Sequence, residues 1–141
     1  MSDNKFIQDN LNTIILGDCL DVMKNIPDKS IDLVLTDPPY GINYDKYASK
    51  QSGKNFGNAA TNKGEYKLTD WDNKLDYKYF KEMFRISNNQ IIFGAEHLCL
   101  LLPQSRGWIV WNKFTGDNNF SDCELAWTNY DKSIKKYDFL W

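Results

Sequence analysis

Hydrophobic positions along this chain fall into short runs, separated by polar segments rich in Gly, Asn and Lys. Apolar runs of this length, bounded by turn residues, are typical of buried strands. They predict strands at residues 13–16, 31–36, 90–93, 107–111 and 123–129. Because a short helical stretch at 19–24 separates the first two runs, we expect those two to be neighbouring parallel strands.

One longer segment has helical periodicity instead. Between residues 72 and 86 the large apolar side chains recur at intervals of three and four, which predicts an amphipathic helix. The residues of this stripe are Leu75, Tyr79, Phe80, Met83 and Phe84. Such a stripe indicates core packing rather than a ligand site. A turn at Asn88-Asn89 and a short helix that follows 94–97 and ends at Pro103 complete the elements, and their mixture predicts an α/β fold.

The strand predicted at 31–36 runs directly into Asp37-Pro38-Pro39-Tyr40-Gly41. Each proline fixes its own φ and keeps the residue before it extended, so this stretch is predicted to be a stiff turn. In open α/β sheets, ligands bind beyond the carboxyl ends of the strands. An acceptor at Asp37 and a stacking face at Tyr40 suit a planar ring with an exocyclic amino group. Spacing alone leaves open a proline-rich turn in which Tyr40 only packs.

Composition narrows the class of protein. A chain of 141 residues is long enough for one domain with a core, and a net charge of −2 gives no global signal for nucleic-acid binding. Three cysteines without a CxxC pair, and a single histidine, predict no metal site. The polar start lacks a signal-peptide core, and the longest apolar run, 98–102, is too short to span a bilayer. We therefore predict a reduced, cytoplasmic chain.

Residues 43–67 contain no sustained periodicity. The segment carries three glycines, and its lysines outnumber its acidic residues. A segment of this length without regular structure, inside a compact domain, is usually functional or disordered. Because it follows the Asp-Pro-Pro-Tyr turn, we interpret it as a mobile lid or a DNA contact. The alternative is a solvated surface loop without a function.

The stretch Asp37-Pro38-Pro39-Tyr40 resembles the catalytic motif of the S-adenosylmethionine-dependent amino-methyltransferases that act on DNA bases. The flanks extend the likeness, from Ile14 to Leu20 upstream and from Pro27 to Leu33 before the motif. The whole segment 12–41 is similar to the amino-terminal part of adenine-specific enzymes whose catalytic motif precedes the cofactor motif. The resemblance implies a Rossmann-like methyltransferase sheet, S-adenosylmethionine as cofactor, and duplex DNA from which the target adenine is flipped.

The resemblance also implies roles for individual residues. Its catalytic positions are Asp37, Pro38, Pro39 and Tyr40. Its cofactor positions are Asp18, Cys19 and Asp37, and its positions for the target base and DNA are Tyr40, Gly41, Lys113 and Phe120. For Asp18 a helix cap is an equally good interpretation. A small basic cluster at Lys132, Lys135 and Lys136 is either a phosphate contact or simply solvated.

The family's glycine-rich cofactor loop has no counterpart among the eight glycines of this sequence. In enzymes with this motif order, that loop and the base-reading segment come later. We therefore expect residues 1–141 to be a single catalytic part of a methyltransferase domain. It would have a partial sheet, flanking helices and a late antiparallel hairpin formed by 107–111 and 123–129. Such a chain is expected to be inactive without a missing or separate carboxyl-terminal segment.

Two other functions remain open on the sequence. The first is a non-catalytic methyltransferase remnant, which could be an oligomer and would bind DNA weakly or not at all. The second is methylation of RNA or of protein.

Overall fold

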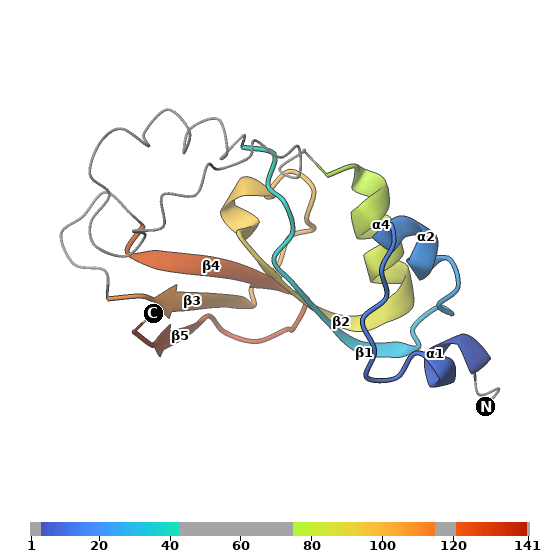
Figure 1. Cartoon of the computed structure of the whole chain (residues 1–141). Helices are drawn as coiled ribbons and strands as arrows, with labels where there is room; N and C mark the ends of the chain where they lie inside the picture. The colour runs from blue at the N-terminus through green and yellow to red at the C-terminus, as the bar shows by residue number, and fades with distance from the viewer. Residues whose placement is uncertain (1–3, 43–74, 115–120, 141) are drawn as a thin grey trace, which may run out of the picture. The chain divides into compact units, whose positions relative to one another are not determined.

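The computed structural model describes residues 4–42, 75–114 and 121–140. Figure 1 shows the arrangement of the elements along the chain. Their bounds are α1 Lys5–Asp9, α2 Cys19–Met23, β1 Ile31–Thr36, α4 Tyr77–Ile86, β2 Ser87–Phe93, the 3-10 turn η1 Ala95–His97, β3 Trp108–Asn112, β4 Cys123–Thr128 and β5 Lys135–Asp138. The chain divides into two compact units, one of Met1–Pro38 with Asp76–Trp141 and one of Pro39–Leu75. All of these elements belong to the first unit.

A mixed five-stranded sheet forms the centre of the first unit, in the order β1-β2-β4-β3-β5. Strands β1 and β2 are parallel, β2 and β4 are antiparallel, β4 and β3 are antiparallel, and β3 and β5 are parallel. The predicted α/β class is therefore confirmed. The late antiparallel hairpin is also present, with Trp108 opposite Trp127 and Asn112 opposite Cys123.

Helix α4 forms because its apolar residues share one face. The Asp76 side chain accepts a hydrogen bond from Lys78 N at 3.0 Å and caps the helix. Phe80, Met83 and Ile86 are buried at intervals of three residues, and α4 packs on β2. The ring of Phe84 meets the ring of Trp127 edge-on at 5.9 Å, which joins the helix to β4. Phe80 and Met83 of the predicted stripe are therefore core, Tyr79 and Phe84 are half-buried, and Leu75 lies before the helix, which begins at Tyr77 and not at 72.

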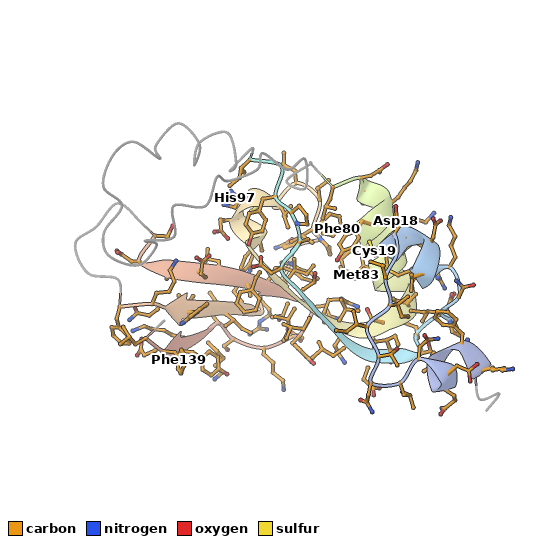
Figure 2. The ribbon with its side chains drawn as sticks, viewed as in Figure 1. Asp18, Cys19, Phe80, Met83, His97 and Phe139 are labelled. Carbon is orange, nitrogen blue, oxygen red and sulfur yellow. The ribbon has the colours of Figure 1, made fainter. Side chains whose placement is uncertain are left out.

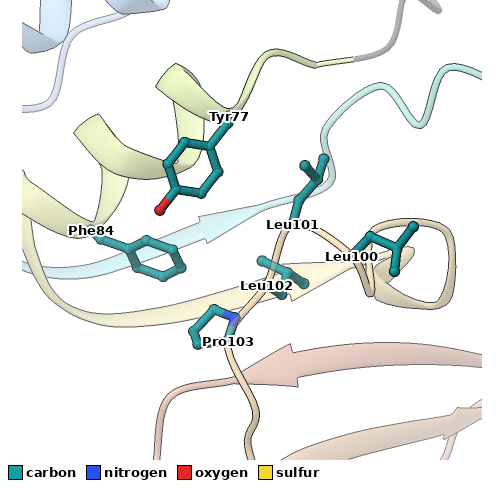
Figure 3. A pocket seen from close by; sticks show the side chains of 6 residues that line it. All are labelled: Tyr77, Phe84, Leu100, Leu101, Leu102 and Pro103. Atoms are coloured by element: carbon teal, nitrogen blue, oxygen red, sulfur yellow. The ribbon is translucent and has the colours of Figure 1, made fainter.

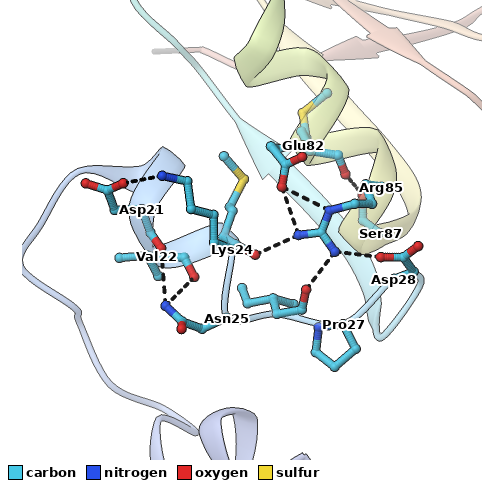
Figure 4. A network of polar contacts seen from close by, with 12 residues as sticks. Asp21, Val22, Lys24, Asn25, Pro27, Asp28, Glu82, Arg85 and Ser87 are labelled. Atoms are coloured by element: carbon cyan, nitrogen blue, oxygen red, sulfur yellow. Dashed lines mark hydrogen bonds and ion pairs between the residues drawn. The ribbon is translucent and has the colours of Figure 1, made fainter.

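Arg85 ties the end of α4 to the turn that follows α2 (Figure 4). Its guanidinium donates to the carbonyl oxygens of Met23 at 2.8 Å and Ile26 at 2.9 Å. It also pairs with the carboxylates of Asp28 at 2.6 Å and Glu82 at 2.8 Å. The fork of donors thus satisfies two backbone acceptors and two charges at once, which fixes α2 against α4.

The strand predicted at 13–16 is wrong. Residues 13–16 have no regular structure, and the side chains of Ile14 and Leu16 are fully exposed. A strand is stable only when a neighbouring strand satisfies its backbone groups, and β1 forms its ladder with β2. The parallel pair predicted between 13–16 and 31–36 is therefore wrong as well, and the observed parallel pair is β1 and β2.

The turn predicted at Asn88-Asn89 is also wrong, because both residues lie inside β2. Their side-chain amides donate to the carbonyl oxygens of Lys29 at 3.1 Å and Asp32 at 3.0 Å. These bonds give two turn-forming side chains partners that are compatible with an extended backbone. Strand β5 was not predicted, since its residues are all exposed and carry no apolar alternation.

Candidate functional site

The parallel strands β1 and β2 have their carboxyl ends at the same end of the sheet, where a ligand site was predicted. Thr36 and Ile92 are opposite each other in the ladder, so the chain leaves both strands at the same place. Asp37 follows β1 and is exposed, whereas Pro38 is buried. Residues 37–40 have no regular secondary structure, as the two prolines predict. A carboxylate is thus presented to solvent at the carboxyl end of a parallel strand.

Thr36 makes a contact that sequence reasoning missed. Its hydroxyl lies 3.2 Å from the hydroxyl of Tyr79, on the first turn of α4, and either group can donate. Burial raises the pKa of the Tyr79 phenol and nearby Cys19 adds to the increase, while the Thr36 hydrogen bond opposes it. The available signal was the polar end of Tyr79, because a tyrosine in a core stripe needs a partner for its hydroxyl.

Asp18 and Cys19 stand at the start of α2 (Figure 2). Asp18 Oδ1 accepts from Leu20 N at 2.8 Å, so the helix-cap role is observed. Both residues are exposed, and the Cys19 thiol is free. Helix α2 packs on α4, and Tyr79 of α4 contacts Thr36 at the end of β1. The predicted cofactor contacts at Asp18 and Cys19 remain predictions.

The second half of the motif lies in the other compact unit, Pro39–Leu75. Within it, Tyr40 is half-buried, and Gly41 has a φ of 71°. That left-handed conformation is one that side chains with a Cβ rarely adopt, so glycine is needed directly after Tyr40. The proposed lid, 43–67, lies outside the described residues.

Lys113 is engaged by a carboxylate within the first unit. Its ammonium lies 2.6 Å from Glu124 Oε1, and its side chain is largely buried. The backbone N–H of Lys113 also donates to the carbonyl of Asp122. Any contact of Lys113 with DNA would have to compete with Glu124. Phe120, the other residue predicted in this loop, lies outside the described residues.

The basic cluster near the carboxyl end lies on and before β5. Lys135 and Lys136 are in the strand, and Lys136 Nζ pairs with Asp138 Oδ1 at 2.9 Å. This hydrogen bond, followed by one from Asn112, lowers the pKa of the Asp138 carboxyl. The arrangement stabilises an edge strand by exposed polar contacts.

An apolar hollow of about 440 Å³ lies between α4 and the segment after η1 (Figure 3). Its lining is Tyr77, Phe84, Leu100, Leu101, Leu102 and Pro103. The side chains are hydrophobic apart from the Tyr77 hydroxyl, so the hollow lacks the convergent polar groups that small-molecule sites use for orientation.

Neither a metal centre nor a membrane span is found in the described ranges. Within 4–42, 75–114 and 121–140, the side chains of His, Cys, Asp and Glu form no group of three or more that could hold a metal ion. Over the same ranges, no helix has both the length and the hydrophobicity that crossing a membrane requires.

Comparison with known proteins gives a partial likeness. No family model matches the chain. The type II methyltransferase M.HinfI of Haemophilus influenzae is 44% identical over 50 residues, which are 36% of this chain and 14% of that enzyme. The type II methyltransferase M.BglII of Bacillus subtilis is 48% identical over 40 residues, 28% of this chain and 11% of that enzyme. The matches span a small part of each relative, and over that length this chain is similar to type II methyltransferases.

Proposed function

We propose that this chain is the catalytic part of a DNA methyltransferase that transfers a methyl group from S-adenosylmethionine to the exocyclic amino group of adenine. The observation that carries the proposal is the exposed Asp37 at the carboxyl end of β1, followed by Pro-Pro-Tyr-Gly. The partial likeness to two type II methyltransferases supports it. A type II relative also suggests a place in a restriction–modification system.

Asp37 and the Pro38 carbonyl are the acceptors for the two hydrogens of the amino group. Accepting both draws the nitrogen toward a tetrahedral geometry and stabilises the positive charge that develops on it. A carboxylate is too weak a base to deprotonate neutral adenine, so Asp37 takes a proton only after transfer. Holding the amino group in one orientation contributes to the catalysis as well.

Tyr40 supplies the face on which the extruded base stacks. Extraction of a base from the duplex costs a few kcal/mol of pairing and stacking. Stacking on an aromatic side chain returns about 1–3 kcal/mol in comparable single-strand sites. Gly41, held at positive φ, lets the chain turn directly after this ring.

S-adenosylmethionine supplies the methyl group when it is bound. The residues of the first unit fit one side of such a ligand. Asp18 and Cys19 are exposed at the start of α2, and a carboxylate that caps through Oδ1 keeps a second acceptor oxygen for an adenine or ribose group. Small-molecule sites bury most of their ligand, so a second wall is required.

In the part of the chain that the structure describes, no strand pairs with the outer side of β1, which supports a further segment as the source of that wall. Strand β1 stands at the end of the strand order, and Leu33 and Leu35 are 40% and 63% exposed. Ile14 and Leu16, before α2, are fully exposed. An apolar strand at an open edge is a template for pairing with another chain segment. A carboxyl-terminal methyltransferase segment, joined or separate, would cover these residues and extend the sheet.

Analysis of methylated nucleosides tests the proposal. The chain is mixed with a separate carboxyl-terminal methyltransferase segment that carries the glycine loop, S-adenosylmethionine and duplex DNA, and the digested DNA is examined by mass spectrometry. N6-methyladenine is the expected product. A methylated cytosine would overturn the adenine assignment, and methylation confined to RNA or protein would overturn DNA as the substrate. If neither DNA, RNA nor protein is methylated, the non-catalytic remnant is the interpretation that stands.

A matched pair of variants tests whether the further segment docks at β1. Leu35→Lys places a charge on the exposed face of β1, and Tyr137→Lys does the same on β5 at the opposite edge, where Tyr137 is 58% exposed. Reconstitution with the separate segment should weaken for Leu35→Lys and not for Tyr137→Lys. Equal behaviour of the two variants would contradict docking at β1.

A further inference from the structure

We propose that Tyr79 is a positioning residue of this site: it holds the carboxyl end of β1 through the Thr36 hydroxyl and so sets the direction in which Asp37 presents its carboxylate. The proposal rests on the proposed function and adds a residue that the Asp-Pro-Pro-Tyr motif does not contain. Its basis is the 3.2 Å contact between the two hydroxyls, which links α4 to the last residue of β1.

The helix side of this contact is rigid. Tyr79 is followed by Phe80, which is completely buried, and the two rings meet edge-on at 5.2 Å. Met83, one turn later, is also buried, and Arg85 fixes the same helix to the turn after α2. The Tyr79 hydroxyl therefore extends from a helix that core packing holds in one position.

The strand side has less support. Strand β1 is at the sheet edge, and Thr36 opposite Ile92 is its last ladder position. Asp37 comes next and is exposed. Because Asp37 precedes a proline, its backbone is restricted to extended conformations. The orientation of the Thr36 backbone therefore determines the direction of Asp37. A hydrogen bond at Thr36 thus acts one residue away from the carboxylate that the reaction needs.

Tyr79 acts in this role as a neutral hydroxyl. Burial, together with nearby Cys19, raises the pKa of its phenol, so the O–H is retained near neutral pH. It is a hydrogen-bond partner and not a base. Tyr79 lies on α4, which packs on α2, and it contacts the end of β1. The sequence assigned the cofactor to the start of α2 and the reacting base to the end of β1.

Four single variants test the inference in the chain reconstituted with the separate carboxyl-terminal segment. Tyr79→Phe and Thr36→Val each remove one hydroxyl with little change of shape, whereas Thr36→Ser keeps it. Tyr77→Phe is the matched control, since it removes an exposed hydroxyl from the same helix. Tyr79→Phe and Thr36→Val should lower kcat about 10- to 100-fold, the range that small misplacements of a reacting group produce.

The KM for DNA should stay unchanged in both variants, because neither residue is placed in DNA binding. Thr36→Ser should restore most of kcat, and Tyr77→Phe should match the wild type. The double variant Thr36→Val with Tyr79→Phe should be no slower than either single variant, since both remove the same hydrogen bond. Wild-type kcat in Tyr79→Phe, additive losses in the double variant, or an equal loss in Thr36→Ser would each overturn the proposal.

A second readout needs no activity. In NMR spectra of the 141-residue chain, the amide and carboxyl signals of Asp37 should move alike in Tyr79→Phe and Thr36→Val and stay in place in Tyr77→Phe. Unchanged Asp37 signals in the first two variants would contradict positioning even if the reconstituted protein were inactive. If the reconstituted wild type is inactive but the Asp37 signals shift in Tyr79→Phe and Thr36→Val, the result would count against the proposed function and support the positioning contact.

Discussion

Thr36 and Ile92 are opposite each other in the parallel ladder of β1 and β2, so the chain leaves both strands at the same edge of the sheet. Asp37 follows β1 at this end of the sheet, and Phe93 and the left-handed Gly94, which has a φ of 62°, follow Ile92 there. Parallel strands meet at their carboxyl ends, where α/β proteins bind ligands. The position of Asp37 in the fold, and not the motif alone, is what makes it a candidate for catalysis.

The Asp37→Ala variant should lower methyl transfer by about 10²- to 10³-fold in the reconstituted protein, the loss typical of removing one preorganised charge-stabilising group. The matched control is Asp32→Ala, which removes another exposed carboxylate from β1. Thermal unfolding of both variants is measured alongside, so that a loss of folded protein is told apart from a loss of catalysis. Near-normal turnover in Asp37→Ala would end its assignment as the catalytic acceptor.

Arg85→Met should lower the free energy of unfolding by about 2 kcal/mol or more, because the substitution keeps the apolar stem but leaves the carbonyls of Met23 and Ile26 without their charged donor. Lys24→Met is the control, since Lys24 forms an exposed pair with Asp21 and such pairs contribute little. Urea unfolding measures both. Equal stability of the two variants would show that the Arg85 contacts do not hold α2 to α4.

Gly107→Ala should destabilise the chain by about 1–3 kcal/mol, the usual cost of overpacking. A Cβ at this position would lie 2.7 Å from Thr128 Oγ1 and would collide with the Tyr130 carbonyl oxygen. Gly17→Ala is the comparison, because its Cβ would meet Val22 Cγ2 at an ordinary 3.7 Å. Thermal denaturation should therefore separate the two variants. A Gly107→Ala protein as stable as Gly17→Ala would mean that the backbone near Tyr130 adjusts freely.

Tyr79 should titrate later than an ordinary tyrosine. Burial raises the pKa of its phenol above the usual 10.0, so the folded state favours the neutral form. The stability this gives is fully present below pH 10 and is lost as the pH rises through the folded-state pKa. Ultraviolet titration of the wild type minus Tyr79→Phe isolates this phenolate. A difference signal centred at or below the ordinary value would contradict the burial of this hydroxyl.

The sequence predicted those helices and strands that depend mainly on residues close to one another in the chain. The apolar run of β1, the Asp18 cap of α2 and the stripe on α4 each depend on neighbours in sequence, and all three are present. The apolar run at 13–16 did not become a strand, because a strand also depends on a partner that no local pattern supplies. Asn88 and Asn89 lie in a strand because their amides bond to residues almost sixty positions away.

The candidate site likewise contains residues that local sequence signals predict and a contact that only the tertiary structure shows. Asp37 and Asp18 could be named from the sequence, since a carboxylate after a strand and one before a helix are local signals. The hydrogen bond between Thr36 and Tyr79 could not, because it joins residues 43 positions apart through the packing of α4. Strand β5, all of whose residues are exposed, is likewise specified by backbone pairing to β3 and not by a hydrophobic pattern.

The most direct test of the central claim is calorimetric titration of the 141-residue chain with S-adenosylmethionine, with and without a separate carboxyl-terminal segment that carries the glycine loop. We predict no strong binding by the chain alone, since the proposed cofactor residues Asp18, Cys19 and Asp37 would supply only one wall of the site. We predict binding, and transfer of labelled methyl groups to duplex DNA, when the segment is added. Micromolar binding by the chain alone, or no binding and no transfer by the mixture, would contradict the central claim.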